Sequence, residues 1–233
     1  MPHGLWERSY GRKVEPLWLY RYKGNRTPVR KVAGPTDKSE RVAARSFAHT
    51  YPVLILLPPS EKKALAPGAA IDVYMGVLYK ALDWASLTQP QRAVGQRSIA
   101  IISAKYGVLR PLDPIEAYKE IINNAVMRKP VTDYLEAIKT DLIIDCRSST
   151  YQGVWTPPFN LCVEIKVFTE LNGVKKIITH MSKKTRGEVT RILLQEVAPT
   201  NPKELCTIIS RHFKCSLIEA TEHSPWVLEV IAH

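Results

Sequence analysis

The sequence predicts an α/β protein with some α+β character: one domain built on a mixed, partly parallel sheet flanked by helices. Short apolar runs such as Val53 to Leu57 suit strands that are buried on both faces. Apolar residues at helical spacing alternate with these runs, and this order indicates parallel pairing. The Asn172-Gly173 pair between two strand-like segments predicts a hairpin, which makes the sheet mixed. We expect a basic N-terminal extension at residues 1–50 and the domain at residues 51–233.

The first half of the domain is predicted from apolar spacing. The strand at residues 53–57 ends at Pro58-Pro59, and one helix is expected across residues 69–86 because apolar side chains recur on one face. The buried-strand pattern returns at residues 99–102. A short helix around Tyr134 to Ile138 and a third strand at residues 142–144 complete this half.

The second half opens with alternating residues at 163–167 that predict a strand, and the hairpin then returns through residues 175–180. Two helices follow. One carries Val189 to Val197, and the other begins with Asn201 as its N-cap and Pro202 at its first position. Strands at residues 217–218 and 226–231 end the pattern.

Composition excludes a disordered, collagen-like or disulfide-scaffold protein, because 45% of the 233 residues are hydrophobic and 24% are charged. The formal net charge of +11 suggests an anionic partner. Four cysteines without framework spacing, and the lack of a long apolar run, favour a cytoplasmic protein with no membrane span. We also expect no secretory signal.

The predicted extension holds 11 Lys/Arg against 4 Asp/Glu, so it carries most of the excess charge. Its cations alternate with aromatic residues such as Trp6, Tyr10 and Trp18, a composition that suits an arm binding nucleic acid. A solvated tail, or a segment packed on the domain, is the favoured alternative because charge runs are usually solvated.

Three polar loops follow the predicted buried strands, and ligands of open α/β sheets bind at such strand ends. Hydroxyls and cations together suit a phosphate. A single loop of this kind is better explained as a turn with solvated cations, whereas three such loops together favour a functional site. If the strands are parallel neighbours, one crevice is expected to be ringed by Ser60, Lys62, Ser103, Lys105, Arg147 and Ser149, with Arg110 beyond.

The segment Ser182 to Gly187 places Lys183, Lys184 and Arg186 at the start of a predicted helix. Cations there oppose the helix dipole by about 0.3–1 kcal/mol each, and a bound anion would offset that cost. Neutralisation by Glu188 is the alternative.

Other motifs are weaker. A Ser-Lys acyl-transfer motif at Ser60 lacks its companion elements. Cys206, His212 and Cys215 are able to approach one another, but their spacing matches no zinc rule, so no metal and no cofactor are expected.

The polar loops resemble the peroxide-stress YaaA family over about residues 51–233. The similar motifs occur in the family's order: Leu56-Leu57-Pro58-Pro59-Ser60-Glu61-Lys62, Tyr74 with Gly76 to Tyr79, Ser103 to Asp113 with Ala117-Tyr118, Asp145 with Arg147 to Ser149, and His180 to Gly187.

This resemblance implies a cytoplasmic protein with a single mixed α/β fold that binds DNA through a positively charged cleft. It also implies a role in hydrogen peroxide resistance and control of free iron. The sequence departs from the family in two places. Only 11 residues separate Lys62 from Tyr74, where relatives carry a long helical insertion associated with DNA contact. In Glu61-Lys62-Lys63, either lysine matches the lysine of the family motif. Residues 1–50 have no expected counterpart.

The leading hypothesis is therefore a nucleic-acid-binding stress protein whose cations engage phosphates, with DNA preferred over RNA. A rival is an enzyme acting on a nucleotide or modified base, with acid or base chemistry from Asp113, Glu116, Tyr118 or Asp145. A third is an interaction protein with a vestigial site. The expected anion-binding residues are Ser60, Lys62, Ser103, Lys105, Arg110, Arg147, Ser149, Lys183, Lys184 and Arg186.

Overall fold

A computed structural model of the chain describes residues 52–171 and 174–232. The predicted extension at residues 1–50, its boundary with the domain, and the predicted turn residues Asn172 and Gly173 lie outside these residues. Among the helices of the described residues, none is long and apolar enough to cross a membrane.

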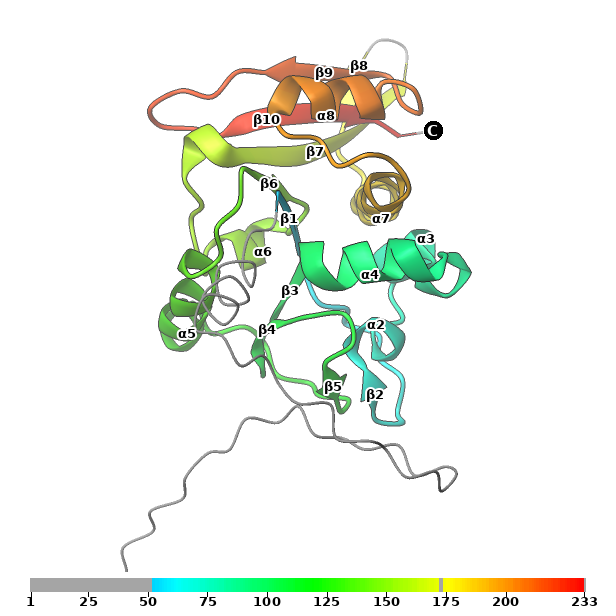
Figure 1. Cartoon of the computed structure of the whole chain (residues 1–233), viewed down its shortest axis with the longest axis vertical. Helices are drawn as coiled ribbons and strands as arrows, with labels where there is room; N and C mark the ends of the chain where they lie inside the picture. The colour runs from blue at the N-terminus through cyan, green and yellow to red at the C-terminus, as the bar shows by residue number, and fades with distance from the viewer. Residues whose placement is uncertain (1–51, 172–173, 233) are drawn as a thin grey trace, which may run out of the picture. The chain divides into compact units, whose positions relative to one another are not determined.

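One mixed sheet organises the described residues (Figure 1). Its strands follow the order β4-β3-β1-β6-β7-β10-β9, and β8 pairs with β7 off this path. The bounds are β1 Val53–Leu57, β3 Ile99–Ser103, β4 Gly107–Leu109, β6 Leu142–Asp145, β7 Cys162–Leu171, β8 Val174–Lys176, β9 Cys215–Ile218 and β10 Trp226–Ile231.

The sheet is mixed and partly parallel, as predicted: its centre is parallel, and antiparallel strands are added at its margins. Strand β1 pairs in parallel with β3 on one side and with β6 on the other, and β7 pairs in parallel with β6 and β10. Strands β4, β8 and β9 each pair antiparallel with their neighbours. A separate two-stranded sheet joins β2 (Gly68–Ala69) to β5 (Pro114–Ile115).

Both faces of the sheet are covered, because alternate residues of β1 belong to two different apolar clusters. Val53, Ile55 and Leu57 join one cluster, whereas Leu54 and Leu56 join the other. All five residues of β1 are buried, which explains the continuous apolar run in the sequence.

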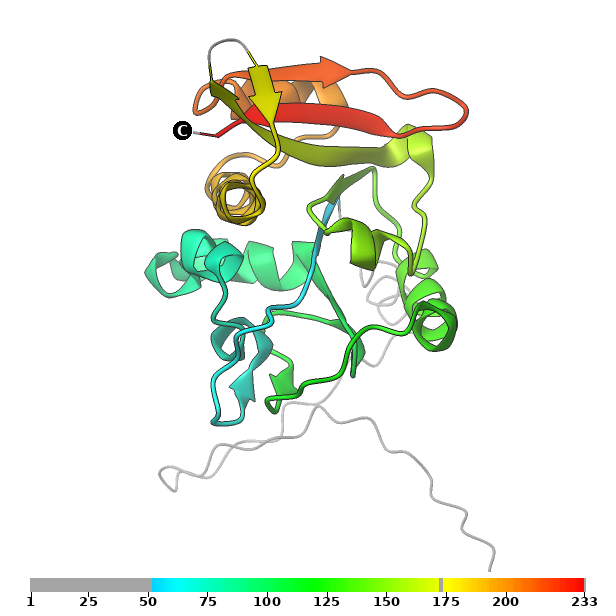
Figure 2. The same ribbon diagram turned by 180° about the vertical axis from the view of Figure 1, so that it is seen from behind.

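Helices pack on the two faces (Figures 1 and 2). The first cluster is covered by α3 (Val77–Leu82), α4 (Gln89–Ser98), α7 (Thr179–Gln195) and α8 (Pro202–Ile209). The second is covered by α5 (Asn124–Glu136) and by the segment around Trp155, which follows the short helix α6 (Ser149–Gln152). A 3₁₀ turn at Phe159–Leu161 leads into β7.

The single helix predicted across residues 69–86 is wrong: this region holds α2 (Ala70–Val73), α3 and a 3₁₀ turn at Trp84–Ser86. The break between α2 and α3 includes Gly76, where a Cβ would collide with the Ser60 side chain. Asp83 ends α3 in the left-handed region with φ of 47°. Apolar spacing was right that side chains such as Leu78 and Leu82 face the core, but Ala85, expected on the same face, is exposed, and spacing does not reveal such breaks.

Helix α4 and strand β4 were missed. Helix α4 buries only Gly95, so its apolar spacing is weak, although Thr88 and Gln91 form a capping box at its start. Helix α5 begins at Asn124, well before the predicted Tyr134, because the Asn123 side chain accepts hydrogen bonds from the N–H groups of Ala125 and Val126.

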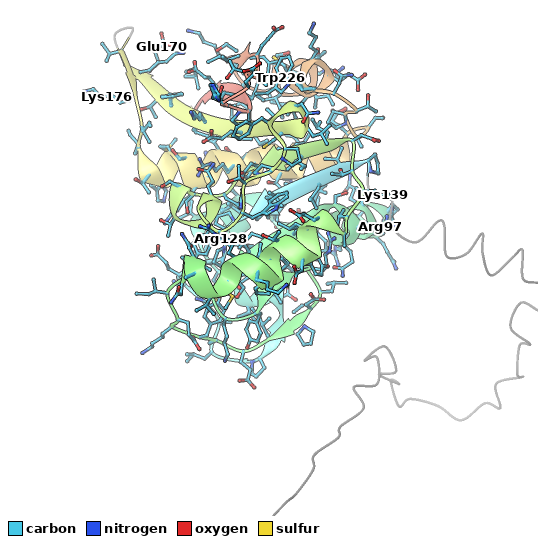
Figure 3. The ribbon with its side chains drawn as sticks, turned by 90° about the vertical axis from the view of Figure 1, so that its left-hand side faces the viewer. Arg97, Arg128, Lys139, Glu170, Lys176 and Trp226 are labelled. Carbon is cyan, nitrogen blue, oxygen red and sulfur yellow. The ribbon has the colours of Figure 1, made fainter. Side chains whose placement is uncertain are left out.

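The predicted hairpin is confirmed by the antiparallel pairing of β7 with β8, in which Thr169 lies opposite Lys176. Glu170 and Lys176 lie near its tip (Figure 3). The returning strand is shorter than predicted, since β8 ends at Lys176 and α7 starts at Thr179. The Asn201 N-cap of α8, with Pro202 at its first position, is confirmed.

Candidate functional site

The carboxyl ends of β3, β1 and β6 lie side by side, because these strands are parallel neighbours. The condition set for a common crevice is therefore met for the loops that follow β1, β3 and β6. These loops carry Ser60 to Lys63, Ala104 to Tyr106 and Cys146 to Tyr151.

A buried cluster of hydroxyls lies beneath these loops. The Oγ of Ser103, at the end of β3, donates to the Oη of Tyr118 over 2.9 Å, and this Oη is 2.8 Å from the Oη of Tyr74. Ser103 also accepts hydrogen bonds from the N–H groups of Lys105 and Tyr106. The hydrogen bonds of the Ser103 hydroxyl with Tyr118 and with the N–H groups of Lys105 and Tyr106 thus hold the loop after β3 in one conformation.

The side chain of Lys63 lies against this cluster. Its Nζ is 3.9 Å from the ring centroid of Tyr118, a cation–π arrangement. Burial lowers the pKa of Lys63, while Glu120 and Glu61 act in the opposite direction. Burial also raises the pKa values of Tyr74 and Tyr118, so both hydroxyls stay protonated at neutral pH.

Several predicted residues lie around the cluster but differ in exposure. Lys62 and Lys105 are exposed, and Ser149 is exposed at the start of α6. Ser60 and Ser103 are buried, and the Ser60 hydroxyl donates to the Lys62 carbonyl over 2.7 Å. The two serines thus shape the loops from inside, whereas the two lysines face solvent.

Arg147 was expected to face a crevice, but it lies in the interior of the protein. Its side chain is fully buried, and its Nε and Nη2 donate to the two carboxylate oxygens of Asp145 over 2.9 and 2.7 Å. Further hydrogen bonds reach the carbonyls of Tyr151 and Trp155. Arg147 therefore fixes the loop after β6 through internal contacts.

Arg110 also lies elsewhere. Strand β4 runs antiparallel to β3, so the chain returns to the amino end of β3, where the Arg110 guanidinium donates to the carbonyls of Ile99 and Arg97. Asp113 accepts a hydrogen bond from the Arg110 N–H over 2.8 Å. Both residues thus lie near the amino end of β3, whereas Ser103 lies at its carboxyl end.

The basic cluster of α7 was expected in the first helical turn. It lies in the second turn instead, because α7 starts at Thr179. His180, expected at a strand end, is also helical. Lys183 Nζ lies 3.6 Å from Glu61 Oε1, so the second turn of α7 meets the loop after β1. Lys184 pairs with Glu188 over 3.1 Å, as the alternative reading of this cluster held.

Arg186 and Gly187 face the interior. Arg186 donates through Nε and Nη2 to the Ile165 carbonyl in β7. A Cβ on Gly187 would fall against the Leu78 carbonyl, so this glycine allows α7 to pack closely on α3. The expected close approach of Gly187 is therefore to a helix.

A hollow of about 330 Å³ lies on the outer side of α7. It is lined by Lys184, Glu188, Arg191, Ile192, His212 and Phe213. Among the described residues, no group of three or more His, Cys, Asp or Glu is placed to hold a metal ion.

Sequence reasoning did not assign Lys63, Tyr74 and Tyr118 to the anion site. Tyr74 and Tyr118 stood in the quoted motifs, and Lys63 was one of two lysines between which the motif did not decide. Two tyrosines separated by 44 residues give no sign in a sequence that their hydroxyls meet.

The fold and the site define the class of this protein. It is a mixed α/β protein with lysines at the carboxyl ends of its parallel strands, above a buried tyrosine–serine cluster. Within that class the chain belongs to the peroxide stress protein YaaA family, whose model matches residues 29–216. The match begins before residue 51, so part of the predicted extension does have a family counterpart.

Relatives are similar over a large part of the chain. A UPF0246 protein of Streptomyces coelicolor is 30% identical over 70% of this chain and 68% of its own length. UPF0246 proteins of Ruegeria pomeroyi and Corynebacterium glutamicum are 32% and 34% identical, each over 60% of this chain and over 63% and 60% of their own lengths. The chain thus spans about two thirds or less of these relatives.

Proposed function

We propose that the chain binds a phosphate-bearing ligand, in the first place DNA, at a lysine surface formed by Lys62, Lys105, Lys183 and Lys184. The observation that carries this proposal is the 3.6 Å contact of Lys183 with Glu61, which joins the basic turn of α7 to the loop that holds Lys62. Exposed cations on neighbouring elements suit the phosphates of a nucleic-acid backbone.

The acidic partners on this surface leave the lysines available. The side chain of Glu61 is 93% exposed and that of Lys183 is 45% exposed, so their ion pair contributes only about 0–1 kcal/mol. A phosphate group that reaches Lys183 can displace such a carboxylate. The excess of cations in the whole chain, +11, supports attraction of a polyanion from a distance.

Three predicted arginines are left out of the lysine surface. Arg147 and Arg186 are engaged with internal acceptors, and Arg110 donates to carbonyls at the opposite end of β3. The segment between Lys62 and Tyr74, where the family resemblance implies a DNA-contacting insertion, holds only β2 and α2 here. We therefore assign DNA contact to the lysines instead of that segment.

We extend the proposal to the biological role: a cytoplasmic protein whose DNA binding serves resistance to hydrogen peroxide and control of free iron. The family description as a peroxide stress protein supports the first part. A screen of peroxide survival with a lysine-surface variant tests whether binding and resistance are coupled.

The direct test replaces Lys62, Lys105 and Lys183 together with glutamine and measures affinity for a fluorescent DNA duplex at several salt concentrations. Each lost phosphate contact lowers the slope of log K against log salt by about 0.9. We expect weaker binding and a flatter slope, with an unchanged circular dichroism spectrum because all three side chains are at least partly exposed.

The matched control replaces three exposed lysines elsewhere, Lys129 on α5, Lys139 after α5 and Lys203 on α8, with glutamine, so it removes the same number of charges. This variant lowers the net charge without touching the lysine surface. An equal loss of DNA affinity in both variants would show that only net charge matters, and it would overturn the assignment of a binding site to the lysine surface.

An enzyme acting on a nucleotide or modified base is the second candidate, and the Ser103–Tyr118–Tyr74 chain beside Lys63 favours it. Asp113 and Asp145 are less suited to acid or base chemistry, since each is engaged with an arginine. Release of a free base from nucleotides or short oligonucleotides by wild type, lost in Tyr118→Phe, would support the enzyme.

A further inference from the structure

Two of the four cysteines lie against each other on the face of the sheet that carries α8. Cys206 belongs to the last turn of α8, and Cys215 is the first residue of β9. The Cys215 Sγ donates to the Cys206 carbonyl oxygen over 3.8 Å, so the two residues are in direct contact. Both thiols are free and partly exposed.

The other two cysteines differ from this pair in their access to solvent. Cys146 and Cys162 are buried, and burial raises the pKa of Cys146 to about 12. Buried thiols of this kind are inert to oxidants in water, since the thiolate is the reactive form and solvent does not reach it. Access therefore separates Cys206 and Cys215 from the remaining pair.

We propose that Cys206 and Cys215 form an oxidisable dithiol, a modification site that a hydroperoxide converts to an intramolecular disulfide. The two residues are nine positions apart, which places a short segment between the sulfur atoms. A disulfide requires two cysteines that already lie close together, and the 3.8 Å contact brings the Cys215 sulfur to the Cys206 residue.

The reaction is balanced with hydrogen peroxide as the oxidant. The Cys206 thiolate attacks one peroxide oxygen, the O–O bond breaks, and the departing hydroxide takes up the proton that the thiol lost, which gives a sulfenic acid and water. The Cys215 sulfur then attacks the Cys206 sulfur, and the S–O bond breaks with release of a second water. Two thiols lose two electrons in total, and one peroxide gains them.

Cys206 is assigned as the attacking thiol. Cys215 suits the resolving role, because burial and the neighbouring Cys206 raise its pKa to about 12. The resolving thiol needs only to be close, and the contact with Cys206 supplies that proximity.

The disulfide would also act on the hollow beside α7. The segment between Cys206 and Cys215 contains His212 and Phe213, which line this hollow opposite Lys184. Closing the segment covalently therefore restrains one wall of it. This inference does not depend on the lysine surface, because neither cysteine belongs to it.

The test exposes the reduced full chain to hydrogen peroxide, blocks remaining thiols with N-ethylmaleimide in denaturant, and maps tryptic peptides by mass spectrometry. Trypsin cleaves after Lys203, Arg211 and Lys214, so the disulfide links residues 204–211 to residues 215–233. We expect this linked pair to appear and to be released by dithiothreitol, while Cys146 and Cys162 are recovered as maleimide adducts.

Variants separate the two roles. Cys215→Ser should leave Cys206 as a sulfenic acid that dimedone traps, whereas Cys206→Ser should lose both the trap product and the disulfide. Cys162→Ser is the matched control and should form the same linked peptides. Recovery of Cys206 and Cys215 as maleimide adducts after peroxide treatment would overturn the proposal, as would equal linkage in the denatured chain.

Discussion

At the scale of single residues, Arg147 shows where polar motifs mislead. An Asp-x-Arg sequence after a buried strand looks alike whether the guanidinium faces a ligand or its own loop. Here the side chain turns back, and Asp145, two residues earlier, accepts two of its hydrogen bonds. Which way such an arginine turns depends on acceptors such as the Trp155 carbonyl, whose position follows from the tertiary fold.

The Arg147–Asp145 pair should be strongly coupled to stability. Replacing Asp145 with asparagine leaves a buried guanidinium without its counter-charge, and breaking a buried pair in this way costs about 3–5 kcal/mol. We expect a large fall in the urea midpoint of Asp145→Asn. The control Glu61→Gln removes an exposed partner and should change the free energy of unfolding by no more than about 0.5 kcal/mol. Equal midpoints would contradict a structural role.

Lys63 illustrates the opposite case, a residue that the sequence left undecided. The exposed Lys62 and the partly buried Lys63 are adjacent and chemically identical in the sequence. The isolated bridge between Lys63 and Tyr74 turns the second lysine toward the Tyr118 ring. Such a choice between neighbours is made by backbone pairing with a distant segment.

At the scale of elements, apolar periodicity identified the sides of helices better than their ends. Val189 and Leu193 of α7 are buried as predicted, but α7 starts several residues before the basic cluster and ends at Gln195, so that Val197, expected on the same face, lies beyond the helix and is exposed. The dipole argument for an anion at Lys183 therefore loses its basis, because the effect is confined to the first turn. Helix α4 was not predicted, because it packs against the rest of the protein with few apolar side chains and so shows no clear apolar spacing.

The crossing of α3 and α7 should depend on Gly187. In Gly187→Ala the added methyl group meets the Leu78 carbonyl and the Ala81 side chain, so the helices must separate, at a cost of about 1–3 kcal/mol. Gly68→Ala is the matched control, since its Cβ would make an ordinary contact of 3.6 Å with Val73. Thermal unfolding of both variants checks this prediction, and equal melting temperatures would contradict it.

At the scale of the whole molecule, the sheet was the most predictable part. Continuous apolar runs identified β1, β3 and β6 because all of their residues are buried. Strand order was not predictable, since nothing in the sequence says that β7 pairs with both β6 and β10. The tyrosine–serine cluster was hidden for the same reason: it is assembled from segments that only this strand order brings together.

Oxidation of the dithiol should change global stability. A disulfide that closes a loop of this length lowers the entropy of the unfolded chain and stabilises the fold by up to about 2.5 kcal/mol. For a domain of this size we expect the melting temperature to rise by about 5–10 °C. Differential scanning fluorimetry of reduced and oxidised protein measures it, and Cys215→Ser should show no rise. A lower melting temperature after oxidation would indicate strain between α8 and β9.

The central position of β1 has a consequence for protein synthesis. Both neighbours of this strand come later in the chain: β3 begins only at Ile99 and β6 only at Leu142. Translation at about 5–20 residues per second therefore leaves Val53–Leu57 without either partner for roughly 2–9 seconds and without β6 for roughly 4–18 seconds. Five consecutive apolar residues with unpaired strand edges are prone to aggregation during that interval. The nascent chain should thus need protection from aggregation until Asp145 has left the exit tunnel.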